Sequence, residues 1–393
     1  MTCDRCGEAA KEGCRFCPEC GEPLDSCTMC SEYARKGYEY CGRCGRCLAN
    51  DKKEDFIVEK TVFIAVICIA AMLALELACM LWYSADTYSY LKDKTLEIFL
   101  LLPQMVTVGQ IGGTSLQLFW IFIMVAILAS CVVVAYQSRA ILNRKSARYI
   151  QGIRSTPAYW IALFFGAYLI LSIAISAIEG ALGYRIIIPD GLPTGVSPES
   201  LFTYADAAVW EEVASRMVPI GVPMVVVAGL CGRRDCLKLL FGGFGMTRVA
   251  LVLMVVSAII FGMAHEGSWG ASKVLPTVIG GLMMSYLFIR FGIHASIAYH
   301  FLLDYSAVMA DAVGAELFSF IFILVAITGF VAVAGVLKYT KEGISGIRDM
   351  PVWIREEEKA EDPETERAGR VTARASAPAW TGTPPRTRSC GTL

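Results

Sequence analysis

The sequence predicts an all-α polytopic membrane protein with about eight transmembrane helices and a small cysteine-rich domain at its N-terminus. Composition is the first observation behind this prediction. The chain has 393 residues, of which 55% are hydrophobic and 18% are charged, whereas soluble domains carry about a quarter charged residues. The distribution of cysteine is the second observation, because ten of the 16 cysteines lie between Cys3 and Cys47. The net charge of −1 gives no general electrostatic case for nucleic-acid binding.

Residues 1–50 contain an internal repeat of cysteine pairs. The pattern Cys-x2-Cys-x10-Cys-x2-Cys occurs twice, and the second copy is the first shifted by 24 residues. Four thiolates in two close pairs suit a tetrahedral structural zinc site, and a closed four-cysteine shell leaves no open position for catalysis. We therefore predict a double zinc ribbon with two structural Zn²⁺ sites, one made by Cys3, Cys6, Cys17 and Cys20 and the other by Cys27, Cys30, Cys41 and Cys44.

Two further cysteines, Cys14 and Cys47, lie outside the repeat and are spare thiols or alternative ligands. A unit this small cannot fold on an apolar core alone, so bound metal would supply its stability. Residues 1–48 hold seven Lys and Arg against eight Asp and Glu, which gives no basic patch for nucleic acid. A structural role, or the docking of a protein partner, is the favoured interpretation of the ribbons.

The rest of the chain is dominated by apolar segments long enough to cross a bilayer, which takes about 20 residues. The expected spans are residues 61–83, 115–136, 157–178, 205–230, 247–265, 274–290, 293–310 and 317–337. The apolar stretch 96–106 is short and contains Pro103, so we expect an interfacial or re-entrant piece there. The expected parts are a double zinc ribbon (1–50), two spans with their connections (51–150), a membrane core (151–338) and a disordered polar tail (339–393).

Basic residues alternate between the expected connections. Segments 139–154, 231–248 and 338–355 are rich in Lys and Arg, while the connections between them are poor in both. Because basic connections stay on the cytosolic side, both termini are predicted to be cytosolic. That placement agrees with the reduced thiols that a zinc ribbon needs.

Three ionisable residues interrupt the fourth expected span, in the stretch Trp210-Glu211-Glu212-Val213-Ala214-Ser215-Arg216. Such groups are costly in a membrane and usually face a protein interior or a watery cavity. On a helix, Glu212 and Arg216 lie on one face and can pair, while Glu211 is turned about 100° away. We expect the pair to hold the helix and Glu211 to remain free for chemistry. The alternative is that both glutamates only brace the arginine.

Two of the three histidines recur in short patterns on later apolar segments, Phe-x-x-x-His ending at His265 and His-x-x-x-Asp running from His300 to Asp304. Together with Glu-Glu-x-x-x-Arg, and in this order, these motifs resemble the CAAX-protease and bacteriocin-processing (CPBP) family of intramembrane proteases. That family includes the type 2 CAAX prenyl endopeptidases. The resemblance covers about residues 150–335.

The resemblance implies an intramembrane endopeptidase that acts on a membrane-associated peptide, such as a prenylated CAAX-type protein. In the family the first glutamate and the first histidine hold and activate a water molecule. Carried over, Glu211 is the general base and His265 its partner, while His300 and Asp304 orient the site or stabilise the oxyanion. The family usually has Asn at the position of Asp304, and an ionised Asp lacks the N–H donor that Asn supplies.

Other functions stay open at this point. Glu211, His265, His300 and Asp304 could supply the three ligands of a catalytic zinc, as in a metalloendopeptidase, although no His-Glu-x-x-His pair is present. The chain could also be a non-catalytic membrane scaffold or immunity-like protein that recruits a partner through its ribbons. A transporter is disfavoured because no repeated halves are evident. The expected partners are membrane lipid, a membrane-associated peptide and a protein bound by the ribbons, with nucleic acid not expected.

Overall fold

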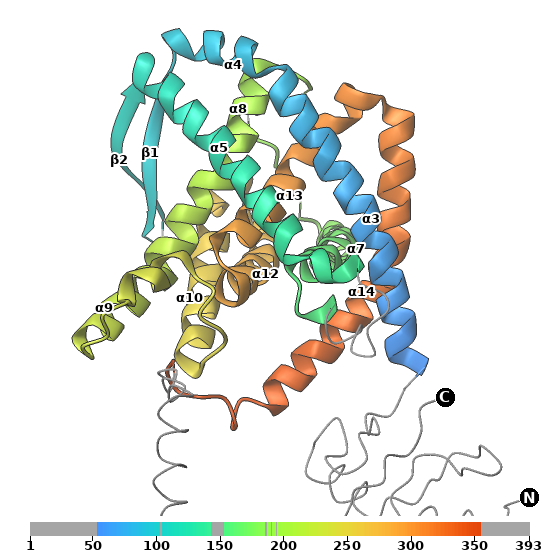
Figure 1. Ribbon diagram of the computed structural model, residues 1–393. Helices are drawn as coiled ribbons and strands as arrows, with labels where there is room; N and C mark the ends of the chain where they lie inside the picture. The colour runs from blue at the N-terminus through green and yellow to red at the C-terminus, as the bar shows by residue number, and fades with distance from the viewer. Residues whose placement is uncertain are drawn as a thin grey trace, which may run out of the picture.

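The computed structural model describes residues 53–102, 104–142, 153–184, 187–189, 191–193 and 195–354. In this part the chain is a bundle of helices with one β-hairpin on its side (Figure 1). Seven helical stretches among the described residues are long and apolar enough to cross a membrane: Lys60–Trp82, Thr114–Gln137, Pro157–Ala181, Pro198–Leu230, Arg248–Trp269, Ala271–Phe291 and Ser319–Ser345. The prediction of a helical multi-pass membrane protein is therefore confirmed, while the predicted double zinc ribbon lies outside the described residues.

The helices follow one another along the chain with short connections. They are α3 (Lys53–Trp82), α4 (Ser84–Tyr90), α5 (Thr114–Gln137), α7 (Pro157–Ala181), α8 (Pro198–Asp206), α9 (Val222–Leu230), α10 (Arg248–Ala264), α11 (Glu266–Trp269), α12 (Val274–Phe291), α13 (Ile293–Val313) and α14 (Ala315–Ser345). Two π-helical segments, η3 (Ala207–Glu211) and η4 (Val213–Gly221), join α8 to α9. The described part also contains short 3-10 turns: η1 (Leu91–Asp93), η2 (Arg139–Leu142), η5 (Cys236–Phe241) and η6 (Ala271–Lys273).

Helix α13 lies inside the bundle. It contacts α3, α5, α7, α8, α12 and α14, and Tyr299, Phe301 and Leu302 in its middle are fully buried. We expected it to be an eighth span, but it is not among the seven because His300 and Asp304 interrupt its apolar run. A helix that its neighbours shield from lipid can carry such groups, since they face protein rather than hydrocarbon. The inner position of α13 thus brings ionisable side chains into the bundle.

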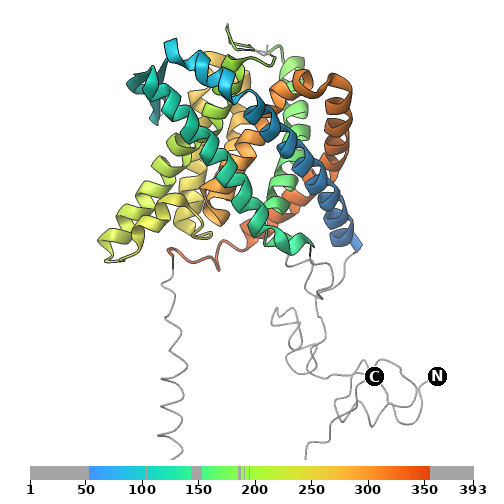
Figure 2. The ribbon, with the colours of Figure 1, turned by 45° about the horizontal axis from the view of Figure 1, so that its top comes forward.

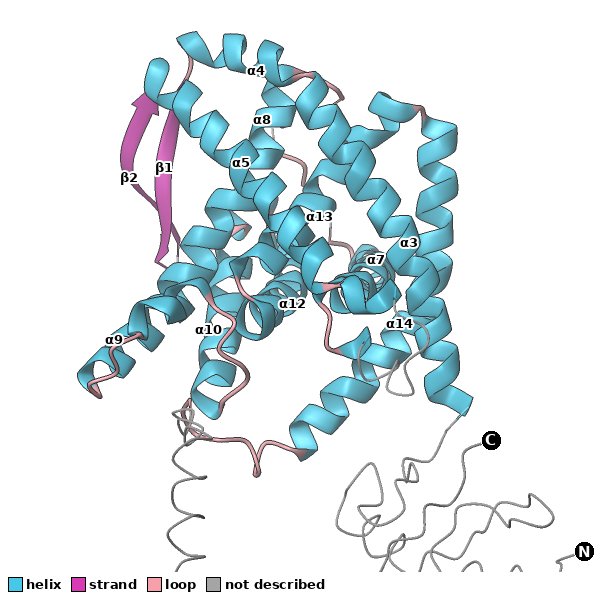
Figure 3. Ribbon diagram, in the orientation of Figure 1, coloured by secondary structure: helices cyan, strands magenta, loops and turns pink. Residues whose placement is uncertain are grey.

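An antiparallel β-hairpin lies where the sequence predicts an interfacial or re-entrant piece at 96–106, and it is an addition to the otherwise helical fold. Strand β1 (Thr95–Leu102) pairs with β2 (Gln104–Gly112), and β2 is the outer strand (Figure 3). Glu97 accepts hydrogen bonds across the hairpin from Thr107 Oγ1 and Gln110 Nε2, both at 3.1 Å.

Helix α14 extends past residue 339, where the polar tail is expected to begin. It ends at Ser345, and the residues that follow return to the start of α10. The Arg248 side chain donates hydrogen bonds to the carbonyl oxygens of Ile347 and Met350 (3.1 Å each) and Arg348 (2.5 Å). This one side chain holds residues 347–350 against the start of α10.

The sequence predicts that connections rich in Lys and Arg alternate with connections poor in both, and the positions of the helix ends agree with this alternation. Figure 2 shows that α3 begins, and α5, α9 and α14 end, at the same end of the bundle. The three basic connections expected at 139–154, 231–248 and 338–355 start from that end. Which end faces the cytosol stays a prediction from the charges.

Candidate active site

Glu211, His265 and His300 come from three separate elements and meet inside the bundle. Glu211 is the last residue of η3, His265 follows the end of α10, and His300 lies in the middle of α13. Oε2 of Glu211 is 3.9 Å from Nε2 of His265 and 3.8 Å from Nε2 of His300. The side chains of Glu211 and His265 are 14% and 13% exposed, so they are largely but not completely enclosed. The structure therefore places the three motif residues around one point.

The neighbouring residue Glu212 has a different set of contacts and is fully buried. Its Oε2 lies 3.5 Å from Nε of Arg216, which confirms the predicted ion pair. Its Oε1 lies 2.9 Å from Nδ1 of His300, and Oε2 accepts a hydrogen bond from the hydroxyl of Ser296. We call Glu212, Arg216 and Ser296 the buried brace. Through Glu212, the brace fixes the ring of His300 from the side away from Glu211.

The helix that carries both glutamates is π-helical rather than α-helical over η3 and η4. Pro219 lies inside η4 and has no N–H to donate to Ser215 O, its partner in a regular α-helix. Ser215 O instead accepts hydrogen bonds from the Ser257 hydroxyl on α10 and from Nη1 of Arg216 at 3.1 Å. The backbone group released by the proline thus ties the site helix to α10. Such π-helical turns are frequent at functional sites.

Phe261, the first residue of the Phe-x-x-x-His motif, lies between the charged groups. Its ring centroid is 4.7 Å from the Arg216 guanidinium carbon, 4.8 Å from the His265 ring and 6.2 Å from the His300 ring. The adjacent Gly262 allows α12 to come close, because a Cβ there would lie 2.3 Å from a Val278 methyl carbon. Close packing of α10 on α12 thereby sets the position of Phe261 and His265.

The hydrogen bonds of His265 indicate its tautomer. Nδ1 lies 2.8 Å from the carbonyl oxygen of Phe261, and since a carbonyl only accepts, Nδ1 must carry the proton. In a neutral ring Nε2 is then an acceptor, and it faces the Glu211 carboxylate, which is also an acceptor. Two acceptors 3.9 Å apart are complementary to a water molecule that donates one proton to each.

His300 has a carboxylate at each ring nitrogen. Besides the contact of Nδ1 with Glu212, Nε2 lies 3.3 Å from Oδ2 of Asp304, one helical turn further along α13. The His-x-x-x-Asp spacing therefore brings His300 and Asp304 into contact on one face of α13. Only the doubly protonated ring can donate to carboxylates on both sides, so the contacts favour a cationic His300. Asp304 is 32% exposed, more than any other member of the site.

Several residues that matter here were not found from the sequence. Ser296 lies four residues before His300, and this helical spacing was a usable signal for the buried brace. Ser257 and the β-hairpin gave no such signal. The indole of Trp210 donates a hydrogen bond of 2.9 Å to Phe99 O, next to a register shift in the hairpin between Ile98 and Phe99. Because β1 contacts η4 and both strands contact α10, the hairpin braces the two helices that carry Glu211 and His265.

The arrangement does not fit a resident metal ion. Among the described residues, no group of three or more His, Cys, Asp or Glu side chains is arranged to hold one. Both ring nitrogens of His300 face carboxylates, and a doubly protonated ring has no lone pair for a metal. The predicted ribbon sites lie outside the described residues.

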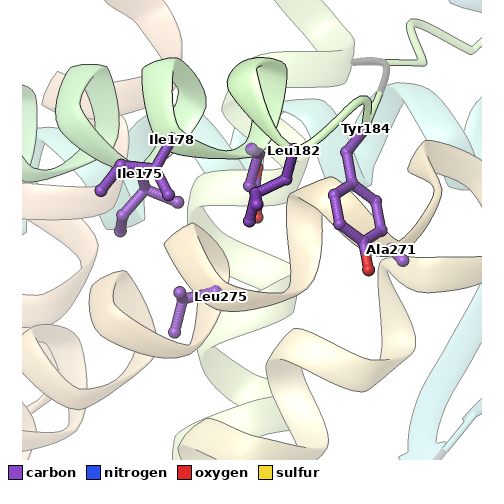
Figure 4. Close-up of a pocket in the computed structure, with 7 residues that line it drawn as sticks. Ile175, Ile178, Leu182, Tyr184, Ala271 and Leu275 are labelled. Atoms are coloured by element: carbon purple, nitrogen blue, oxygen red, sulfur yellow. The ribbon is translucent and has the colours of Figure 1, made fainter.

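A cavity of about 360 Å³ opens elsewhere, between the end of α7 and the start of α12 (Figure 4). Its lining is mostly apolar and includes the Glu179 carboxylate and the Tyr184 hydroxyl; the lining residues are Ile175, Ile178, Glu179, Leu182, Tyr184, Ala271 and Leu275. None of the six candidate site residues lines it, so we assign it no part in the chemistry.

The sequence was also compared with protein-family models, curated proteins and solved structures. Searches of curated proteins and of solved structures give no match. A family model matches part of the chain, and the matched segment contains all six candidate residues, Glu211, Glu212, Arg216, His265, His300 and Asp304. Residues 194–306 match the family described as type II CAAX prenyl endopeptidase Rce1-like.

Proposed function

We propose that this protein is an intramembrane endopeptidase that hydrolyses a peptide bond of a membrane-associated substrate through a water activated by Glu211. The observation that supports this proposal most is the meeting of Glu211 with His265 and His300 inside the bundle, at 3.9 and 3.8 Å. The family match over residues 194–306 supports the same reaction class. The six residues Glu211, Glu212, Arg216, His265, His300 and Asp304 make up the proposed catalytic machinery.

In the proposed reaction, a water molecule lies between Glu211 Oε2 and His265 Nε2. The oxygen of the water attacks the substrate carbonyl carbon while Glu211 takes a proton from the water. This step forms a tetrahedral intermediate. The carbon–nitrogen bond then breaks, and the protonated Glu211 returns the proton to the leaving amine. His265 orients the water through its unprotonated Nε2.

The negatively charged oxygen of the tetrahedral intermediate needs a hydrogen-bond donor. The Nε2–H of His300 points toward Glu211 and Asp304, so a substrate oxygen in that gap can accept from it. The buried brace holds His300 in this orientation through Nδ1. Asp304 orients the same Nε2–H, a role that an acceptor-only side chain can fill although it cannot donate.

The family description makes a prenylated CAAX-type peptide the first substrate to test. We further propose that both termini are cytosolic and that residues 1–50 bind two zinc ions and dock a protein partner. These proposals rest on the charge pattern and the cysteine repeat alone.

The test is cleavage of a prenylated peptide by purified full-length protein in lipid vesicles, with the Glu211→Gln protein beside it and a zinc chelator in parallel samples. Cleavage by the wild type, its loss in the variant and its persistence with chelator are expected. If the chelator stops cleavage, a double variant, Cys17→Ser with Cys41→Ser, which breaks both predicted ribbons, separates the two explanations. An active double variant that is still stopped by the chelator would place the metal at the membrane site and overturn the water mechanism.

The competing function is a membrane scaffold without catalysis. Absence of cleavage by wild-type protein across prenylated and unprenylated membrane peptides would favour that function over ours.

A further inference from the structure

We propose that the outer edge of the β-hairpin binds the substrate as an added β-strand, so that the peptide is held in an extended form at the depth of Glu211. This inference rests on the proposed endopeptidase function and names how that site recognises its substrate, through the peptide backbone. It starts from strand β2, which the proposed reaction does not use.

Strand β2 has one edge without a strand partner. The only sheet among the described residues has two strands, so β1 pairs with one edge of β2 and no described strand pairs with the other. Every residue from Met105 to Gln110 is exposed, and Figure 1 shows β2 as the outer strand. A row of unpaired N–H and C=O groups of this kind is a template for another extended chain.

The hairpin lies at the depth of the active site within the membrane. Strand β1 contacts η4, which occupies the middle of the membrane-spanning stretch Pro198–Leu230. The hydrogen bond from the Trp210 indole to Phe99 O joins the hairpin to the residue just before Glu211. Open sheet edges do not occur against lipid hydrocarbon, because no water is there to bond the free backbone groups. An edge at this depth therefore needs a polar cover.

The side chains of the hairpin fit a polypeptide cover better than lipid. Glu97, Thr107 and Gln110 form a hydrogen-bonded group that is exposed. A carboxylate open to hydrocarbon is costly, whereas the N–H groups of a peptide can donate to it. The apolar side chains of Val106 and Val108 on the same strand are 43% and 56% exposed. The strand thus offers polar and apolar contacts together, as an extended peptide also does.

A membrane peptide that is to be cleaved needs such a partner as well. In an α-helix the carbonyl groups are hydrogen-bonded along the helix and enclosed by side chains, so the chain must be extended for water to reach a carbonyl carbon. An extended segment inside a bilayer has unpaired backbone groups of its own. Pairing with β2, by β-strand addition, satisfies the free groups of both chains. Recognition would then depend on extension of the substrate more than on its side chains.

The first test locates the bound peptide by photo-crosslinking. A photoreactive phenylalanine analogue replaces Val108 on β2 or, as the matched control, Val125 on α5, whose exposed fractions are 56% and 58%. Both proteins are full-length, lie in lipid vesicles and carry Glu211→Gln, so that the prenylated peptide stays intact. We expect about tenfold more peptide adduct from position 108 than from position 125.

Two results of this test would overturn the inference. Equal labelling from both positions would show that the peptide meets the protein only through the lipid. Adducts between two copies of the chain at position 108, without peptide adducts, would assign the open edge to a dimer.

The second test is an N-methyl scan of the same peptide, one backbone amide at a time on the amino side of the scissile bond. An antiparallel edge uses only every second N–H of the added strand. The adduct yield from position 108 should therefore fall by about tenfold at alternate positions, which corresponds to ~1.4 kcal/mol of lost binding, and stay unchanged between them. A uniform effect, or none at any position, would overturn the inference. The same scan of kcat/KM with wild-type protein checks this pattern without any substitution.

Adduct yield and cleavage are measured separately, so this inference and the proposed function fail separately. A period of two in the adduct yield, without cleavage by the wild type, would support the strand site and contradict the endopeptidase. Cleavage by the wild type without that period in either measurement would overturn the strand site and leave the endopeptidase standing.

Discussion

Glu211 and Glu212 are adjacent in the chain but lie in contrasting surroundings. Glu212 is fully buried and has contacts with Arg216, Ser296 and His300. Glu211 is partly exposed, and the histidine nitrogens around its carboxylate stay 3.8 Å away or more. The Glu212 carboxylate is bound by other side chains of the protein, whereas the Glu211 carboxylate has space beside it for a reactant.

The difference shows how a membrane helix can combine support with reactivity in two consecutive residues. A buried charge must be matched by partners, and once matched it is inert. A reactive group must instead be left with unfulfilled bonding capacity in a place that a substrate can reach. Substitutions at and around the two glutamates should therefore separate loss of activity from loss of stability.

The largest effect on activity is expected from Glu211→Gln. Gln has the same shape but cannot take a proton from water, so the cleavage rate should fall by about 10²–10⁴-fold. Thermal unfolding of the variant should match that of the wild type, because the ring nitrogens nearest to the Glu211 carboxylate lie 3.8 and 3.9 Å away, beyond hydrogen-bond distance. A large loss of stability would show that Glu211 also braces the bundle.

Glu212→Gln should have the largest effect on stability. Arg216 would remain fully buried without its counter-charge, which costs about 3–5 kcal/mol. The measurement is the free energy of unfolding in detergent, with Glu97→Gln on the exposed hairpin as the matched control. If Glu212→Gln were as stable as the control, the buried brace would not hold the helix.

Ser296→Ala sharpens the comparison with a smaller change. It removes a hydroxyl donor to the Glu212 carboxylate, and hydrogen bonds to charged groups contribute about 1.5–3 kcal/mol. Ser306→Ala is the control on the same helix, since that hydroxyl bonds only to Leu303 O nearby. Equal unfolding free energies for the two variants would contradict the assigned role of Ser296.

The smallest effect is expected from Trp210→Phe, which keeps an aromatic ring but loses the donor to Phe99 O. The lost bond is worth about 0.5–1.5 kcal/mol, and we expect it to appear in kcat more than in KM because Glu211 is the next residue. Trp82→Phe, at a side chain that is 82% exposed, is the control. An unchanged kcat would mean that the hairpin does not position Glu211.

The membrane spans and the Glu212–Arg216 pair could be predicted from the sequence, because both depend on local sequence features. Apolar runs of sufficient length mark spans regardless of their neighbours, and Glu212 and Arg216 are close on any helix because of their local spacing. The motif order likewise singled out Glu211, His265 and His300, although it could not supply the distances between them.

Other features depend on contacts between distant segments and were out of reach. The hydrogen bond from the Ser257 hydroxyl to Ser215 O joins residues of two different helices, so no local spacing in the sequence could predict it. The β-hairpin pairs residues as far apart as Thr95 and Gly112, and the apolar stretch 96–106 has no regular alternation of polar and apolar side chains that would predict this pairing. The inner position of α13 follows from the packing of helices distant in sequence, although His300 and Asp304 in its apolar run were a hint.

The shielding of α13 has a consequence for how the protein is made. A segment that carries His300 and Asp304 is a poor candidate for partitioning into lipid alone as it leaves the ribosome. We expect its integration to wait for the earlier helices and to be completed together with α14. His300 would then reach Glu211 only in a finished bundle, so that assembly itself would delay the onset of activity in the nascent chain.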